Sequence, residues 1–246
     1  MATKVAFLTN AREYTGPPAA AALSAAGWSV FSHDDAFASP ERRRSYERDN
    51  PGQIACAVQD MAEFVGEGIA RFGRIDGLIS NDIPKRTTPY FEVTDPLQDF
   101  EQHLDSLILE PVRLLRAALP SMKAAKSGSI VMVTSGAPLR VPAMAGPLGY
   151  TAARAGAHGL VKALAVELAP TGIQVNAVAP FLVYSQTFFP SDLGADDPQF
   201  MPYVNKMVPM QRWGQPHEIG ALIAHLISGD AAFVSGQVIA FSGAGC

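Results

Sequence analysis

Several features that would assign a function directly are missing from this chain of 246 residues. Its two cysteines, Cys56 and Cys246, are too few for a disulfide framework or a cysteine-ligated metal, which is typical of proteins from a reducing compartment. The five histidines show no spacing suited to a metal site. No apolar run is long enough to cross a bilayer, and the first residues lack a signal-peptide layout. We therefore expect a soluble, cytoplasmic protein without a bound metal.

Charge is also scarce. Charged residues make up 17% of the chain and hydrophobic ones 48%, so the composition is globular, with ample material for a core. The net charge of −4 gives no electrostatic reason to expect nucleic acid or a membrane as a partner. Because no internal repeat or linker divides the chain, we predict a single domain over residues 1–246.

Apolar strand patterns alternate with helical patterns along the whole chain. Strands are expected at 4–9, 28–32, 76–81, 129–134, 173–179 and 237–241, and helices at 57–72, within 95–126, at 150–168 and at 218–228, after a first helix that ends at Ala26. This alternation predicts an α/β fold, a Rossmann-like doubly wound parallel sheet with helices on both faces. Residues 33–35 are expected to form a solvated loop, and Pro111 is expected to kink its helix.

The turn after the first strand lacks the glycines of a dinucleotide site. Such a turn lets the main chain approach a pyrophosphate at the start of a helix. Here Gly16 stands alone, and Arg12, Glu13 and Tyr14 occupy positions that need small residues. Since the bulky Tyr14 would occupy the phosphate space, the sequence argues against a pyrophosphate site at this turn.

The stretch from Val131 to Glu167 carries the candidate chemistry. Ser135 ends a buried strand, so its hydroxyl should lie at the carboxyl edge of the sheet, where open α/β sheets place their ligands. Tyr150 opens an Ala-rich helix, and Arg154 follows one helical turn later on the same face.

A phenol beside a guanidinium can serve as a base. A free tyrosine titrates near ~10, and a downward shift of about two units needs roughly 3 kcal/mol of preference for the phenolate. A guanidinium about 4 Å away supplies around 4 kcal/mol at an effective dielectric of ~20. Tyr150 could therefore deprotonate an alcohol held by Ser135, while Arg154 stays charged. An isolated Tyr-x-x-x-Arg is more often an ordinary aromatic and a solvated arginine, but the strand-end Ser135 favours the catalytic interpretation.

Over nearly its full length the chain resembles the short-chain dehydrogenase/reductase superfamily. The matching pieces are the strand ending at Asn81, Ser135, the Tyr150 helix, IQVNAVAP at 173–180 and SGQVIAFSGAG at 235–245. The superfamily's glycine-rich turn is missing, and its catalytic Tyr-x-x-x-Lys is Tyr-x-x-x-Arg in this sequence.

Within that superfamily the chain resembles the halohydrin dehalogenases, a branch without a cofactor. They carry a Ser-Tyr-Arg triad and a Thr-x4-Phe/Tyr-x-Gly turn, which here runs from Thr9 through Tyr14 to Gly16. The resemblance implies that Ser135, Tyr150 and Arg154 convert a vicinal haloalcohol to an epoxide and a halide. In reverse, the epoxide would be opened by an anion such as halide, cyanide, azide or nitrite.

The departing halide needs a small site with N–H donors. The turn formed by Pro180, Phe181, Leu182 and Val183 follows a strand and can present such groups to an anion. The resemblance implies that Tyr14 and Phe189 close the wall, although ordinary loop packing explains Phe181 and Phe189 equally well. Asp82, at a neighbouring strand end, is expected to orient Arg154 or simply to cap its strand.

Two rival functions remain open at this stage. One is an NAD(P)-dependent short-chain oxidoreductase with an atypical cofactor turn, and the other is a non-catalytic regulatory or scaffold member. By analogy with the superfamily we expect a homotetramer, whose dimer face is formed by the 100–126 helix and the helix after Tyr150.

Overall fold

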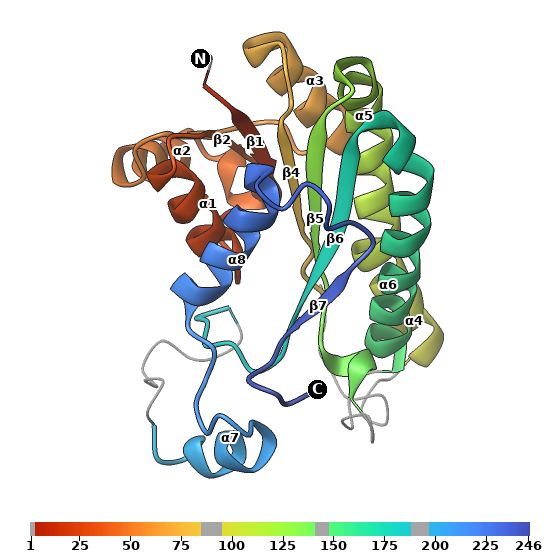
Figure 1. Cartoon of the computed structure of the whole chain (residues 1–246). Coiled ribbons are helices and arrows are strands. Elements are labelled where there is room, and N and C mark those ends of the chain that lie inside the picture. The colour runs from red at the N-terminus through yellow and green to blue at the C-terminus, as the bar shows by residue number, and fades with distance from the viewer. Residues whose placement is uncertain (1–2, 85–94, 141–147, 188–196) are drawn as a thin grey trace.

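The computed structural model describes residues 3–84, 95–140, 148–187 and 197–246. Seven parallel strands form one sheet in the order β3-β2-β1-β4-β5-β6-β7 (Figure 1). The strands are β1 Val5–Leu8, β2 Ser29–Ser32, β3 Gln53–Ala55, β4 Gly77–Asn81, β5 Gly128–Val133, β6 Ile173–Pro180 and β7 Val238–Phe241. The strand order reverses between β1 and β4, which is where doubly wound sheets bind their ligands.

Helices cover both faces of the sheet, as the sequence predicted (Figure 1). They are α1 Gly16–Ala25, α2 Pro40–Asp49, α3 Met61–Phe72, α4 Pro96–Leu104, α5 Glu110–Ala125, α6 Leu148–Leu168, α7 Met201–Met207 and α8 Pro216–Ser228. Helices α3, α5 and α6 pack on one face, and α1 and α8 pack on the other, each group around its own apolar core. The predicted fold class is therefore confirmed.

The central strands are fully buried, which explains their unbroken apolar sequences. Their parallel register aligns the strand ends, because Asn81 pairs with Val133 and Val133 pairs with Val178. The residues that follow β4, β5 and β6 consequently meet at one edge of the sheet. This edge carries the candidate site.

The helix expected within 95–126 is interrupted. A π-helical turn, Asp105–Leu109, separates α4 from α5, and Pro111 lies in the first turn of α5. Because Pro111 has no N–H, it cannot bond the carbonyl four residues earlier, and the regular helical ladder breaks here. The short strand β3 and the helix α7 were not predicted from the sequence.

The prediction of a solvated loop at 33–35 is wrong for its first two residues. His33 is 2% exposed and Asp34 is 5% exposed. The carboxylate of Asp34 accepts hydrogen bonds from the main-chain N–H groups of Arg12 and Ala36, each at 3.0 Å. Asp34 is therefore buried because it anchors the turn after β1, a contact between distant residues that local polarity does not reveal.

No helix in the described ranges combines the length and the apolar character needed to cross a bilayer.

Candidate active site

The turn between β1 and α1 is closed by hydrogen bonds within the turn and to distant residues of the chain. Besides the bond from Arg12 to Asp34, each of the following N–H groups already has an acceptor. Ala11 donates to His33 O at 2.9 Å, Glu13 to Asn10 O at 3.1 Å, Tyr14 to Thr187 Oγ1 at 2.7 Å and Gly16 to Glu13 O at 2.8 Å. These donors are consequently not available to a phosphate group.

The start of α1 is equally unsuited to an anion. Pro17 and Pro18 have no N–H, and the next donor, Ala19 N, bonds Thr15 O at 3.1 Å. Gly16 is tightly enclosed, since a Cβ built there would lie 2.5 Å from Asn10 O. A dinucleotide needs free N–H groups and close main-chain approach at this point. The residues present do not fit a pyrophosphate.

Asn81 locks this closed turn onto the end of β4. Its side-chain amide donates to Asn10 O at 2.9 Å and to Glu13 O at 2.8 Å, and its Oδ1 accepts from Thr15 Oγ1 at 2.8 Å. Asn81 is fully buried, so each of these bonds would leave an unpaired polar group if it were lost. Its role here is structural.

Ser135 lies where the sequence placed it, directly after β5. It is buried, and its Oγ accepts a hydrogen bond from Ala137 N at 3.1 Å. The hydroxyl hydrogen is not used in that bond, so Ser135 can still donate to another oxygen. Next to it, Thr134 Oγ1 lies 3.1 Å from His158 Nε2, which docks α6 onto the end of β5.

Tyr150 and Arg154 are brought together on α6. The guanidinium carbon of Arg154 lies 5.3 Å from the centroid of the Tyr150 ring. Arg154 is only 2% exposed, and it donates to the main-chain oxygens of Val133 at 2.9 Å and Asp82 at 2.7 Å. A solvated arginine is therefore excluded, and this cation is fixed between the ends of β4 and β5 beside the phenol.

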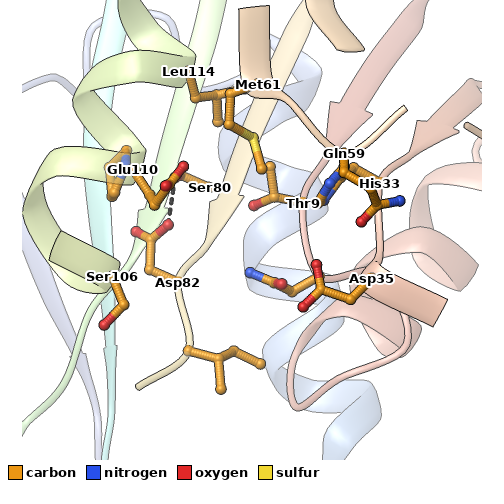
Figure 2. A pocket seen from close by; sticks show the side chains of 13 residues that line it. Thr9, His33, Asp35, Gln59, Met61, Ser80, Asp82, Ser106, Glu110 and Leu114 are labelled. Atoms are coloured by element: carbon orange, nitrogen blue, oxygen red, sulfur yellow. Dashed lines mark hydrogen bonds between the residues drawn. The ribbon is translucent and has the colours of Figure 1, made fainter. Parts of the chain in front are cut away.

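Asp82 contacts Arg154 through its carbonyl oxygen rather than through its carboxylate. The carboxylate instead accepts from Ser80 Oγ at 2.6 Å (Figure 2). Burial raises the pKa of Asp82 to about 7, although the bond from Ser80 and the charge of Arg154 oppose the shift; nearby Glu110 adds to it.

The side chain of Tyr14 lies close to the Tyr150–Arg154 pair. Burial raises the pKa of Tyr14, as does the nearby phenol of Tyr150, while the charge of Arg154 opposes this effect. Tyr14 therefore stays a neutral phenol. Its backbone adopts a left-handed conformation with φ of 49°, a region that glycine usually occupies, and its side chain packs against the core beneath α1.

The turn after β6 differs from the turn after β1. Phe181 N continues the sheet by donating to Phe241 O at 3.0 Å, and Leu182 is left-handed with φ of 47°. Within the described part of the chain, the N–H groups of Leu182 and Val183 have no hydrogen-bond partner. Two of the predicted anion donors are thus available, whereas Pro180 has no N–H and that of Phe181 is already used.

Phe181 points into a small separate core, and Phe189 lies outside the described residues. The Phe181 ring packs with Val204, Val208 and Trp213. Arg140 covers this ring at 5.1 Å and also donates to the main-chain oxygens of Met207 and Gly245. Arg140 thus supports the turn after β6. Sequence reasoning missed it, because no local pattern links it to its partners.

Comparison with known proteins agrees with this architecture. Over residues 16–243 the chain matches the family model described as enoyl-(acyl carrier protein) reductase, and it belongs to the short-chain dehydrogenase/reductase superfamily of enzymes. One relative is a 3-oxoacyl-(acyl-carrier-protein) reductase of Staphylococcus aureus. It is 30% identical over 252 residues, covering 98% of this chain and 97% of the relative.

The solved structures point to one branch of that superfamily. A structure titled "Dehalogenation enzyme" is 35% identical with a TM-score of 0.92, covering 99% of this chain and 98% of that one. A halohydrin dehalogenase (HheC) bound to ethyl (2S)-oxiran-2-ylacetate is 31% identical with a TM-score of 0.90, covering 98% and 96%. The resemblance to halohydrin dehalogenases inferred from the sequence is confirmed.

Proposed function

We propose that this chain is a halohydrin dehalogenase, a carbon–halide lyase that works without a cofactor. The observation that carries the proposal is the closed turn after β1, which places Tyr14 beside a fixed Tyr150–Arg154 pair. A nicotinamide enzyme needs the space and the N–H groups that this turn uses itself. The likeness to a solved halohydrin dehalogenase with a bound epoxide supports the same assignment.

In the proposed reaction, Tyr150 takes the hydroxyl proton of a vicinal haloalcohol. The oxygen then uses its electron pair to attack the neighbouring carbon, and the halide leaves with the electrons of the carbon–halogen bond. Ser135 donates a hydrogen bond to the substrate oxygen, and Arg154 favours the phenolate through its charge. In reverse, Tyr150 protonates the epoxide oxygen while a halide, cyanide, azide or nitrite ion opens the ring.

The departing anion is assigned to the turn after β6. The N–H groups of Leu182 and Val183 would donate to it, and Pro180 and Phe181 would shape the turn. Tyr14 supplies an aromatic wall, and the resemblance assigns Phe189 to the same wall. Asp82 holds Arg154 in place through its carbonyl oxygen. The expected homotetramer stays a prediction by analogy.

The second candidate is an NAD(P)-dependent oxidoreductase, which the similarity to the 3-oxoacyl reductase favours. It would have to seat a pyrophosphate at a turn where the N–H groups of residues 11–14 and 16 are already paired. The two functions differ in what they require, since only the oxidoreductase depends on added NADH or NADPH.

The test is halide release from a simple vicinal bromo-alcohol without any added cofactor. Wild-type protein should release bromide, Tyr150→Phe should not, and circular dichroism should show the same fold for both. Tyr203→Phe is a matched control, because Tyr203 is 40% exposed on α7, outside the proposed site. Bromide release by Tyr150→Phe at the wild-type rate would remove Tyr150 from the mechanism. NADH-dependent ketone reduction by a wild-type sample that releases no bromide would establish the oxidoreductase instead.

A further inference from the structure

A second cavity lies at the same sheet edge and is lined by none of the three proposed catalytic residues. It has a volume of about 170 Å³ and lies between the ends of β1, β2 and β4 and the start of α5 (Figure 2). A cavity of about 150 Å³ is known to hold a benzene molecule, so this one suits a ligand of roughly six heavy atoms.

Two buried polar side chains that line this cavity have atoms without a hydrogen-bond partner in the described ranges. Asp82 is 5% exposed, and its Oδ2 has no hydrogen-bond partner within the described ranges. His33, on the opposite wall, is 2% exposed; its ring nitrogens make no hydrogen bond of good geometry in the described ranges. Burial lowers the pKa of His33, although the main chain of Gln59 lies near enough to oppose this shift. Unpaired buried groups of this kind are costly, about 1–3 kcal/mol each, so they indicate a place where a ligand completes the hydrogen bonding.

The charge of the lining selects the class of ligand. Asp35, Asp82 and Glu110 contribute carboxyl groups, whereas no lysine or arginine is found among the described residues of the lining. Arg154 donates its hydrogen bond to the carbonyl oxygen of Asp82, and its charge favours the ionised form of the Asp82 carboxyl. The cavity therefore disfavours anions and suits a cation. A metal ion is not indicated, because no group of three suitable ligands occurs in the described part of the chain.

The remaining walls suit an organic cation. Ser106, on the π-helical turn, donates its hydroxyl hydrogen to Gln102 O at 2.9 Å, so its lone pairs can accept from a ligand. Met61 and Leu114 form an apolar wall (Figure 2). We propose that this cavity binds a small organic ammonium ion, with its N–H groups directed at Asp82 and Ser106 and its carbon skeleton against Met61 and Leu114.

Binding should depend on pH through the ionisation of Asp82. The groups that face this carboxyl are Ser80 on β4, Glu110 on α5 and Arg154 on α6, and burial raises its pKa to about 7. An alkylammonium ion keeps its charge up to a pKa near ~10.4. The ligand must therefore hold Asp82 in its ionised form. Its affinity should be constant above about pH 8 and should fall by roughly tenfold for each pH unit below 7.

Calorimetric titration with cyclopentylammonium chloride, and with cyclopentanol as its neutral isostere, tests the proposal. We expect the ammonium ion to bind at least about tenfold more tightly than the alcohol at pH 8, as a charge-assisted hydrogen bond requires. Asp82→Asn should weaken ammonium binding by a similar factor. Met61→Phe, which narrows the cavity without touching Asp82, should weaken both ligands. Asp105→Asn removes a nearby exposed carboxylate outside the lining and should change neither.

Three results would overturn the proposal. The first is equal affinity for cyclopentanol and the ammonium ion, and the second is ammonium binding that is unchanged in both Asp82→Asn and Met61→Phe. The third is the absence of heat at millimolar ammonium in folded wild-type protein.

Discussion

Two turns at the same edge of the sheet follow buried strands, yet their main-chain N–H groups differ in whether the protein itself bonds them. Each contains a non-glycine residue in the left-handed region, Tyr14 after β1 and Leu182 after β6. The N–H groups from Ala11 to Tyr14 and that of Gly16 are paired within the protein, whereas those of Leu182 and Val183 have no partner in the described chain. The fold alone therefore does not decide where an anion binds. The decisive property is which donors the rest of the protein leaves unpaired.

The first turn is closed by acceptors that come from distant parts of the sequence. Asp34 supplies a carboxylate to Arg12 N, so the turn already holds an anion of its own. Thr187 accepts from Tyr14 N and donates to the carboxylate of Glu13 at 2.8 Å, which also ties the turn to the segment after β6. The two turns are thus physically linked, and changes in one can be used to test the other.

Among these variants, Arg154→Lys should cause the largest loss, measured as the rate of halide release. Lysine keeps the charge but cannot reach the carbonyls of both Val133 and Asp82 with a planar fork. We expect halide release to fall by about 100-fold or more, a loss typical for a misplaced electrostatic group. Because the turn after β1 stays closed, the variant should gain no affinity for NADH. Saturable NADH binding by Arg154→Lys would show that the residue at position 154, and not the closed turn, decides whether the protein binds a nicotinamide cofactor.

Gly16→Ala should break the closed turn itself. The added Cβ would meet Asn10 O at 2.5 Å and Ala11 O at 2.8 Å, both main-chain atoms that cannot move aside easily. We expect a loss of about 1–3 kcal/mol in the free energy of unfolding, measured by urea denaturation. Gly66→Ala on α3 is the matched control, since nothing lies within 4 Å of its Cβ. This control should gain about 0.5–1 kcal/mol, and equal losses in both variants would contradict the tight packing at Gly16.

Asp82→Asn should change the free energy of unfolding by a smaller amount, and this change should depend on pH. The folded pKa of about 7 lies above the value near ~3.9 of an unfolded chain, so the fold favours the protonated carboxyl. The protonated carboxyl contributes its full stabilisation below about pH 4, and this contribution is lost as the pH rises from 4 to 7. Between pH 5 and 6, wild type should lose about 1.4 kcal/mol of unfolding free energy relative to Asp82→Asn. A constant difference across this range would mean that Asp82 is ionised throughout.

The sequence predicted the parts of the site that depend on local pattern. The β-branched run before Ser135 predicts a strand end, and the spacing of Tyr150 and Arg154 fixes them on one helical face. The bulky residues of the turn after β1 predicted that Tyr14 occupies the phosphate space; the structure places its phenol near Tyr150 and Arg154, and its role stays a prediction. The fold class followed from the alternation of strand and helix patterns.

The features that the sequence did not reveal depend on contacts between distant segments. Asp34 bonds a turn 22 residues earlier, and Arg140 reaches Met207 and Gly245. The π-helical turn at Asp105–Leu109 arises from a missing N–H in the middle of an otherwise regular helical pattern. Neither the periodicity nor the spacing of residues predicts such contacts, because the partners are far apart in the sequence and meet only in the folded structure.

The most direct test of the comparison is to titrate one wild-type sample separately with sodium bromide and with NADH in a calorimeter. We predict saturable heat with bromide and none with millimolar NADH, because the N–H groups of residues 11–14 and 16 in the turn after β1 are bonded within the protein, whereas those of Leu182 and Val183 have no partner in the described chain. Saturable NADH binding, together with no response to bromide, would contradict the account and would mean that the turn after β1 opens to accept a pyrophosphate.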